Sequence, residues 1–241
     1  ILIDDAGYND FGFMGSKEMQ TPNIDALTSE GVVFTDAHVA ATVSSPSRAC
    51  LITGRYGHRF GYECNLSDRT NGLPLEEETI AEVFKTNGYR TAAIGKWHLG
   101  SRDEQHPNNR GFDLFYGMKA GGRDYFYNEK KSDRPGDERN LLLNDRQVKF
   151  EKYLTDAFSE KAVEFINESS QPFMMYLAYN AVHTPMQATD EDMAKFEGHP
   201  RQKLAAMTYA LDRGVGTVIR GLKDSGKFDN TLIFFLSDNG G

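Results

Sequence analysis

The sequence predicts an α/β protein with a largely parallel, mixed sheet that is covered by helices on both faces. Short apolar runs alternate along the chain with amphipathic segments of helical spacing. Strands that alternate with helices in this way are typical of a parallel sheet whose two faces are both covered. The chain has 241 residues, of which 39% are hydrophobic and 26% charged, so it can bury a full core.

Five short apolar runs are expected to form the strands of this sheet. They are residues 1–3, 32–34, 91–94, 173–179 and 232–236. Short continuous apolar runs are typical of strands buried on both faces. In open α/β sheets ligands bind beyond the carboxyl ends of the strands, so the residues that follow these runs are the first candidates for a site.

Three longer segments are expected to be helices. They are residues 74–86, 153–167 and 201–222, and Gly88 supplies a C-terminal stop for the first. The stretch 101–146 is rich in Asn, Asp, Gly and Arg and has no clear periodicity, so we expect an excursion over the surface that helps to form a substrate rim. The whole chain, 1–241, is interpreted as one domain.

Charge and composition exclude several classes of function. The formal net charge is -8, and acidic and basic residues are mixed along the chain, so the footprint of a nucleic-acid-binding protein is absent. No apolar run reaches roughly 18 residues, so no membrane span is expected in this chain. Cys50 and Cys64 are too few for a disulfide framework and fit no zinc pattern.

Carboxylates follow the first and the last of the expected strands. Asp4 and Asp5 come directly after one, and Asp238 and Asn239 follow the other. Adjacent acids at a buried strand end need a neutralising partner, and oxygen-only ligands suit Ca²⁺ or Mg²⁺, with Ca²⁺ favoured in a crowded, irregular site. The alternative interpretation is that both pairs are turn signals after strands.

A short helix is predicted to begin at Ser44 or Ser45. Pro46 occupies its first turn and Gly54 ends it. The free backbone N–H groups at such a helix start attract a tetrahedral anion, and Arg48, one turn later, adds a permanent positive charge.

The residues from Ser44 to Arg55 resemble the sulfatase signature, in which Cys or Ser is followed by any residue, Pro, a small residue and Arg. Further matches lie in the family's order and span nearly the whole chain: Asp4–Tyr8, Thr21–Asp25, Gly95–Gly100, His183–Pro185 and Ser237–Gly240. The resemblance implies an alkaline phosphatase-like fold. It also implies that this chain is the N-terminal catalytic part, incomplete at both ends and without the family's smaller C-terminal domain.

The resemblance implies hydrolysis of a sulfate ester by a formylglycine that a maturation enzyme makes from Ser44. One hydroxyl of the aldehyde hydrate attacks sulfur and expels the alcohol, and the second hydroxyl then drives the elimination of sulfate. The matching catalytic residues are Ser44, Arg48, Lys96, His98 and His183, and the matching calcium ligands are Asp4, Asp5, Asp238, Asn239 and the modified Ser44. His183 would protonate the leaving oxygen.

Serine rather than cysteine at position 44 resembles bacterial sulfatases matured by a radical iron–sulfur enzyme. Such enzymes are commonly exported to the periplasm or the cell surface, where they remove sulfate from saccharides. Asn9 stands where the family commonly has glycine, outside the expected ligands. Four polar or aromatic residues of the excursion are candidate sugar contacts: Arg110, Arg123, Asp124 and Tyr125.

Two other functions stay open from the sequence. An unmodified Ser44 would fit a phosphatase or phosphonate hydrolase of the same superfamily, although the extra Asp and His ligands of a two-zinc site are missing. A noncatalytic protein that binds sulfated glycans would keep the fold without maturation, and the complete set of expected catalytic residues argues against it.

Overall fold

A seven-stranded mixed sheet forms the centre of the computed structural model, which describes residues 1–65 and 72–241. Its strands lie in the order β5-β4-β3-β2-β6-β1-β7. The pairs β3–β2, β2–β6, β6–β1 and β1–β7 are parallel, whereas β4 pairs antiparallel with both β3 and the edge strand β5. The strand bounds are Leu2–Ile3 (β1), Arg90–Lys96 (β2), Leu114–Met118 (β3), Leu142–Leu143 (β4), Arg146–Gln147 (β5), Phe173–Ala178 (β6) and Leu236–Ser237 (β7). The predicted fold class is confirmed.

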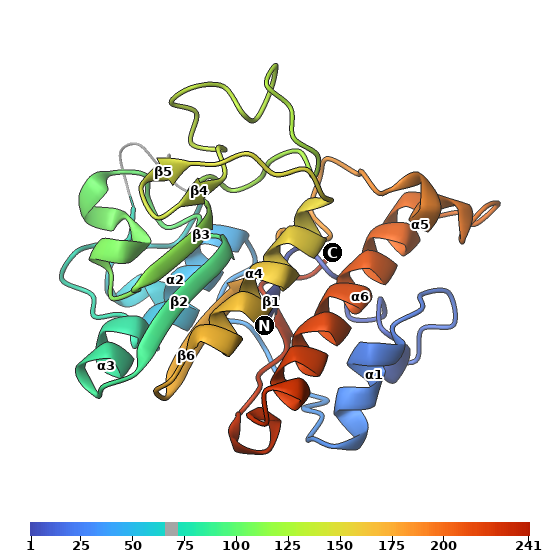
Figure 1. Ribbon diagram of the computed structural model, residues 1–241, viewed down its shortest axis with the longest axis horizontal. Helices are drawn as coiled ribbons and strands as arrows, with labels where there is room; N and C mark the ends of the chain where they lie inside the picture. The colour runs from blue at the N-terminus through green and yellow to red at the C-terminus, as the bar shows by residue number, and fades with distance from the viewer. Residues whose placement is uncertain (66–71) are drawn as a thin grey trace.

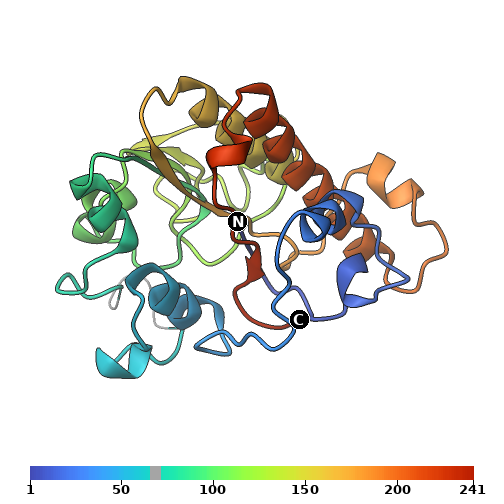
Figure 2. The same ribbon diagram turned by 90° about the horizontal axis from the view of Figure 1, so that it is seen from below.

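Helices cover both faces of the sheet (Figures 1 and 2). One face packs on α4 and α6, and the other packs on α2 and α3; in Figure 2, α4 and α6 lie above the sheet and α2 below it. Successive residues of β2 alternate between the two cores, since Ala92 and Ile94 face α4 and Ala93 faces α2. The helix bounds are Pro22–Ser29 (α1), Ser44–Thr53 (α2), Ile80–Thr86 (α3), Leu154–Glu168 (α4), Asp190–Ala194 (α5) and Gln202–Asp224 (α6).

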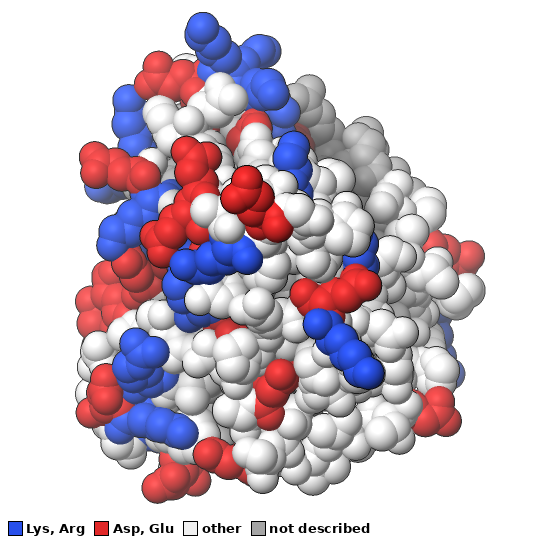
Figure 3. All heavy atoms as spheres, turned by 90° about the vertical axis from the view of Figure 1, so that its right-hand side faces the viewer, with Lys and Arg blue, Asp and Glu red and all other residues white. Residues whose placement is uncertain are grey.

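Short 3-10 helices complete the described secondary structure. They span Gly12–Met14, Gly57–Arg59, Asp103–Gln105, Pro107–Asn109 and Phe228–Asn230. Two helices, α1 and α5, were not expected from the sequence, and both pack against α6. On the face that these helices share, basic and acidic side chains are interspersed (Figure 3).

The predictions for α4 and α6 are confirmed to within two residues at each end, but the prediction for α3 placed its start too early. The helix begins at Ile80 because Thr79 and Glu82 form a capping box: the Thr79 hydroxyl accepts from the Glu82 N–H, and the Glu82 carboxylate accepts from the Thr79 N–H. Residues 74–78 form turns before this cap.

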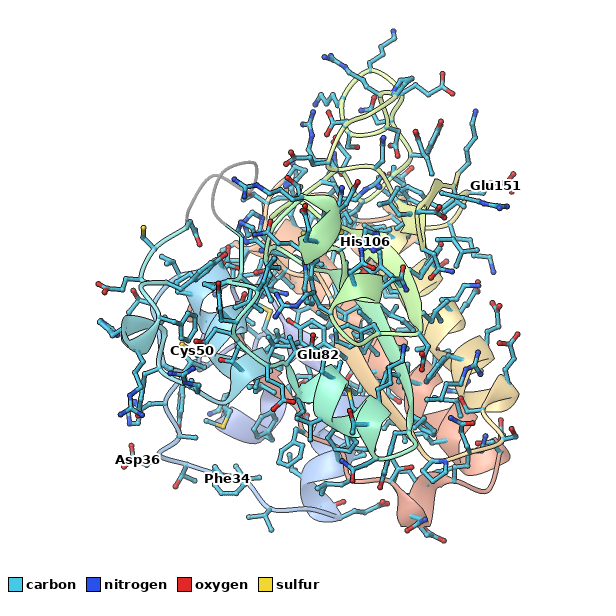
Figure 4. All side chains as sticks on the ribbon, turned by 90° about the vertical axis from the view of Figure 1, so that its left-hand side faces the viewer. Phe34, Asp36, Cys50, Glu82, His106 and Glu151 are labelled. Carbon is cyan, nitrogen blue, oxygen red and sulfur yellow. The ribbon has the colours of Figure 1, made fainter. Side chains whose placement is uncertain are left out.

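The expected strand at 32–34 is wrong, and the one at 232–236 is mostly wrong. Val32 and Phe34 are 80% and 73% exposed, and their segment pairs with no described strand. Phe34 lies at the margin of the molecule, whereas Cys50 on α2 lies within it (Figure 4). In the last run only Leu236 joins the sheet, opposite Leu2. A three-residue apolar run carries no information about whether a neighbouring strand exists to pair with it.

The stretch 101–146 is not only a surface excursion, because it supplies β3 next to β2 in the sheet. Phe115 and Met118 of this strand are 1% and 0% exposed. Beyond β3 the chain rises above the carboxyl edge of the sheet before it returns to α4 (Figure 1). This later part is the one that borders the candidate site.

Candidate active site

Four parallel strands end at one edge of the sheet, and the start of α2 lies at the same edge. The chain after β1 brings Asp4 and Asp5, and the chain after β7 brings Asp238 and Asn239. The end of β2 and the loop after it bring Lys96 and His98, the loop after β6 brings His183, and α2 brings Ser44 and Arg48. Contacts join the other expected catalytic residues and metal ligands to this cluster, and His98 is connected to it through its carbonyl, which accepts from the Ser45 hydroxyl of α2.

The centre of the site is a set of buried ion pairs. Lys96 Nζ lies 2.9 Å and 2.7 Å from the two carboxylate oxygens of Asp4. The Arg48 guanidinium donates to one Asp238 oxygen through Nε at 3.0 Å and through Nη2 at 2.8 Å. Arg48 Nη2 also lies 3.2 Å from Asp4. The side chains in these pairs are entirely shielded from solvent.

Ser44 projects from the first residue of α2 into these pairs. Its hydroxyl lies 2.7 Å from Asp238 Oδ2 and 3.3 Å from Asp4 Oδ1, and it accepts a hydrogen bond of 3.0 Å from Arg48 Nε. Ser44 is 6% exposed. A nucleophile at this atom would therefore have a permanent cation on one side and two carboxylates on the other.

Two further hydroxyls of the same helix, which were given no role at the sequence level, anchor it to the strand ends. Ser45 Oγ donates to the carbonyl of His98 at 2.7 Å, and Ser47 Oγ donates to the carbonyl of Asp238. They fix the start of α2 relative to β2 and β7. In the sequence the two serines are recognisable only as small polar residues on either side of Pro46, and this pattern does not show which loops they contact.

Three carboxylates and one amide oxygen could hold a metal ion here. Oxygen atoms of Asp4, Asp5 and Asp238 all lie within 4.8 Å of one another. Asn239 donates from Nδ2 to Asp5 at 2.7 Å, while its buried Oδ1 has no hydrogen-bond partner among the described residues. An orphaned buried acceptor beside three carboxylates fits a hard divalent cation, because Ca²⁺ and Mg²⁺ take oxygen ligands.

Burial sets the charge states around the cluster. Burial raises the pKa of Asp4 and lowers that of Lys96, because both lose hydration when charged. For Asp238 burial acts in the same upward direction, but the Arg48 guanidinium and the Ser44 hydroxyl outweigh it and hold the pKa at about 2. Burial, with Lys96 and Arg48 nearby, lowers the pKa of His98 to about 3, so this imidazole is neutral.

His183 stands at the open side of the site. Its Nδ1 lies 2.6 Å from the carbonyl of Thr184, which can only accept, so Nδ1 carries a proton. Nε2 faces the cluster at 3.7 Å from Asp5. In this orientation a protonated His183 presents its Nε2–H toward the cluster, which is the geometry that a general acid needs.

The four candidate sugar contacts are buried, so that expectation is wrong. Arg110, Arg123, Asp124 and Tyr125 are 2%, 2%, 6% and 0% exposed. Arg123 pairs with Asp133 at 2.7 Å, and Arg110 donates to backbone carbonyls, so both stabilise loops. These polar side chains satisfy buried backbone and carboxylate groups, which composition alone could not distinguish from a binding rim.

Tyr125, expected from the sequence to contact a sugar, instead lies against the loop that carries His183. Its hydroxyl lies 2.6 Å from the carbonyl of Asn180 and 2.8 Å from the carbonyl of His183. Its backbone N–H donates to Gln187 at 2.8 Å. The segment after β3 is thus joined to the loop that carries His183.

Comparison with known proteins gives consistent matches. The family model for sulfatases matches residues 1–241. The uncharacterized sulfatase YdeN of Escherichia coli K12 is 36% identical over 93% of this chain and 44% of its own length. Human N-acetylgalactosamine-6-sulfatase is 30% identical over 100% of this chain and 49% of its own length. A solved structure of Ps i-CgsB in complex with k-i-k-neocarrahexaose is 46% identical, with a TM-score of 0.93 over 100% of this chain and 57% of that one.

The chain therefore spans about half the length of these curated relatives. Across residues 1–65 and 72–241, no helix combines the length and the apolar character needed to cross a membrane.

Proposed function

The chain belongs to the sulfatase family, and we propose that it hydrolyses a sulfate ester through a formylglycine made from Ser44, with Ca²⁺ as the metal. The observation that carries the proposal is the position of Ser44 Oγ, 2.7 Å from Asp238 and 3.0 Å from Arg48 Nε, inside the oxygen cluster. A maturation enzyme would supply the oxidant. The hydrated aldehyde has two hydroxyl groups, one of which attacks sulfur while the other later drives elimination of sulfate. An unmodified serine has only one hydroxyl group.

Ca²⁺ would be held by the side chains of Asp4, Asp5, Asp238 and Asn239. When bound, the metal would hold sulfate oxygens and stabilise negative charge in the transition state. It would also replace Lys96 as the main counter-charge of Asp4, which frees the ammonium group to contact the sulfate. We infer Ca²⁺ rather than Mg²⁺ because an irregular set of carboxylates and an amide suits the larger ion.

The remaining side chains have separate roles in binding and cleaving the sulfate ester. Arg48 holds the nucleophile at position 44, and neutral His98 contacts sulfate beside Lys96. His183 protonates the ester oxygen as the sulfur–oxygen bond breaks, so the alcohol leaves neutral. An in-line displacement would require the proton donor and the nucleophile to act on opposite sides of the sulfur atom.

We propose a sulfated saccharide as the substrate class. The support is that a protein 46% identical to this chain was solved with a neocarrahexaose, and that a 30% identical relative is named for N-acetylgalactosamine 6-sulfate hydrolysis. Carrageenan oligosaccharides are therefore the first substrates to screen. A bacterial source and a periplasmic or cell-surface location fit a polymer that enters the cell only after degradation.

The test is to produce the protein with and without a radical maturation enzyme and to analyse the peptide that contains residue 44. We expect loss of two hydrogens from Ser44 only with the maturation enzyme, and turnover of aryl sulfate only in that sample. Ser44→Ala should be inactive, and the exposed Ser170→Ala should match the parent. Preference for aryl phosphate by unmodified protein would overturn the proposal in favour of a phosphatase.

A further inference from the structure

Two consecutive glycines, Gly121 and Gly122, lie against the two active-site imidazoles. They follow β3 in the segment that rises over the carboxyl edge of the sheet. A methyl group built on Gly121 would lie 2.6 Å from both Cε1 and Nε2 of His98. One built on Gly122 would lie 3.3 Å from Cε1 and 3.4 Å from Nδ1 of His183.

Backbone conformation does not explain these glycines. Neither Gly121 nor Gly122 is among the residues with a positive φ, so other residues could adopt their conformation. The restriction comes from the neighbouring rings. Because adjacent Cα atoms are about 3.8 Å apart, the single peptide between the two glycines reaches from one imidazole to the other.

Hydrogen bonds hold the segment on both sides and oppose its movement away from the rings. Before the pair, the carbonyl of Lys119 accepts from the His98 N–H at 3.0 Å, and the Ala120 N–H donates to Glu138 at 3.1 Å. After it, the Tyr125 hydroxyl lies 2.6 Å from the carbonyl of Asn180 and 2.8 Å from that of His183. A side chain added at Gly121 would therefore displace the His98 ring rather than the backbone.

We propose that Gly121–Gly122 is a positioning element of the active site, a wall without side chains that sets the locations of both imidazoles relative to the nucleophile. Gly121 acts through His98 and Gly122 acts through His183. This inference rests on the proposed sulfatase activity. Neither glycine is proposed to contact the reacting atoms.

Double-mutant cycles on the matured protein test the proposal, with 4-nitrophenyl sulfate and a sulfated saccharide as substrates. Gly121→Ala should lower kcat/KM by about 100-fold on both, because a displacement near 1 Å at a catalytic group can cost that much. In a His98→Ala background the same change should cost less than about 3-fold, because residues that act through one another are non-additive.

Gly122→Ala is the milder arm of the experiment. Contacts of 3.3–3.4 Å require His183 to shift by only a few tenths of an ångström. We expect a loss of about 10-fold on the saccharide ester and a smaller loss on the aryl ester, whose leaving group needs less protonation. The loss should vanish in a His183→Ala background.

Gly31→Ala is the matched control, since it adds a methyl group near a single backbone oxygen, Leu27 O at 3.0 Å, outside the site. It should keep parental kcat/KM. Additive losses in both cycles, or parental activity of Gly121→Ala, would overturn the positioning role. A parent protein without activity on either sulfate would instead refute the proposed function, so the two failures are distinguishable. Should Gly121→Ala fail to fold, the cycle at Gly122 decides.

Discussion

The candidate active site has a buried half and an open half that differ in how their charges are compensated. In the buried half, Asp4 and Asp238 pair with Lys96 and Arg48, and these side chains have essentially no contact with solvent. In the open half, the side chains of Asp5 and His183 are 40% and 30% exposed, and they lie 3.7 Å apart.

This difference predicts that charges in the two halves contribute unequally to stability. The buried acids and bases are equal in number and satisfy one another, so each is needed to offset the desolvation of its partner. The open groups have water as an alternative partner, so their loss leaves no buried charge uncompensated. We therefore expect the loss of a buried charge to cost more stability than the loss of an open one.

The largest expected effect comes from breaking the buried half with Asp238→Asn. The change leaves the Arg48 guanidinium without its closest counter-charge, and breaking a buried pair costs about 3 kcal/mol or more in the free energy of unfolding. Activity should fall by more than about 1000-fold through lost metal binding and a misplaced nucleophile. Urea unfolding in a chelator and calcium titration calorimetry measure the two effects separately.

Asp5→Asn is the matched change in the open half. Calcium affinity should fall, but the free energy of unfolding without metal should change by less than about 1 kcal/mol, because exposed pairs contribute little. Equal destabilisation by the two variants would contradict the division of the site into halves. Unchanged calcium binding in both would remove the proposed metal ligands.

An intermediate effect is expected for His183→Ala. Loss of the proton donor should slow a saccharide sulfate by about 100-fold or more, within the usual range for general acid catalysis. The activated 4-nitrophenyl sulfate should slow less, since its alcohol leaves without protonation. Comparison of kcat on the two substrates is the measurement, and equal losses would exclude the role of His183 as the acid.

Sequence patterns predicted the parts of the fold that carry long periodicity. The helices α4 and α6 were recoverable because 15 and 23 residues repeat their apolar spacing. The strand β3 was not, because Leu114–Met118 is five residues long inside a polar stretch. The prediction of a strand at 32–34 was wrong for the opposite reason: an apolar run does not show whether a neighbouring strand is present to pair with it.

The gathering of the candidate site residues at one edge of the sheet was predictable from the sequence, but the residues that position them were not. Strand-end acids and the motif at Ser44 are local patterns, and parallel strands bring them to one edge. The roles of Tyr125 and Gly121 depend on contacts with His183 and His98, far away in the sequence. Such contacts leave no periodic or spacing signal.

The smallest effect is expected for Tyr125, which connects the segment after β3 to the open half of the site. Tyr125→Phe removes a hydroxyl group that lies 2.6 Å from the Asn180 carbonyl and 2.8 Å from the His183 carbonyl. The two carbonyls share this one buried O–H donor, and its loss is expected to lower stability by about 1–2 kcal/mol.

Because the hydroxyl contacts the backbone of His183, Tyr125→Phe should also slow hydrolysis of the saccharide ester a few-fold while leaving that of the aryl ester nearly unchanged. Tyr127→Phe is the control, since its hydroxyl interacts with the exposed Glu129 and Lys149 and, among the described contacts, not with the loop that carries His183. Thermal unfolding and kcat on both esters measure the outcome. A loss of stability with an unaltered ratio of the two rates would mean that Tyr125 supports the loop but not the position of the acid.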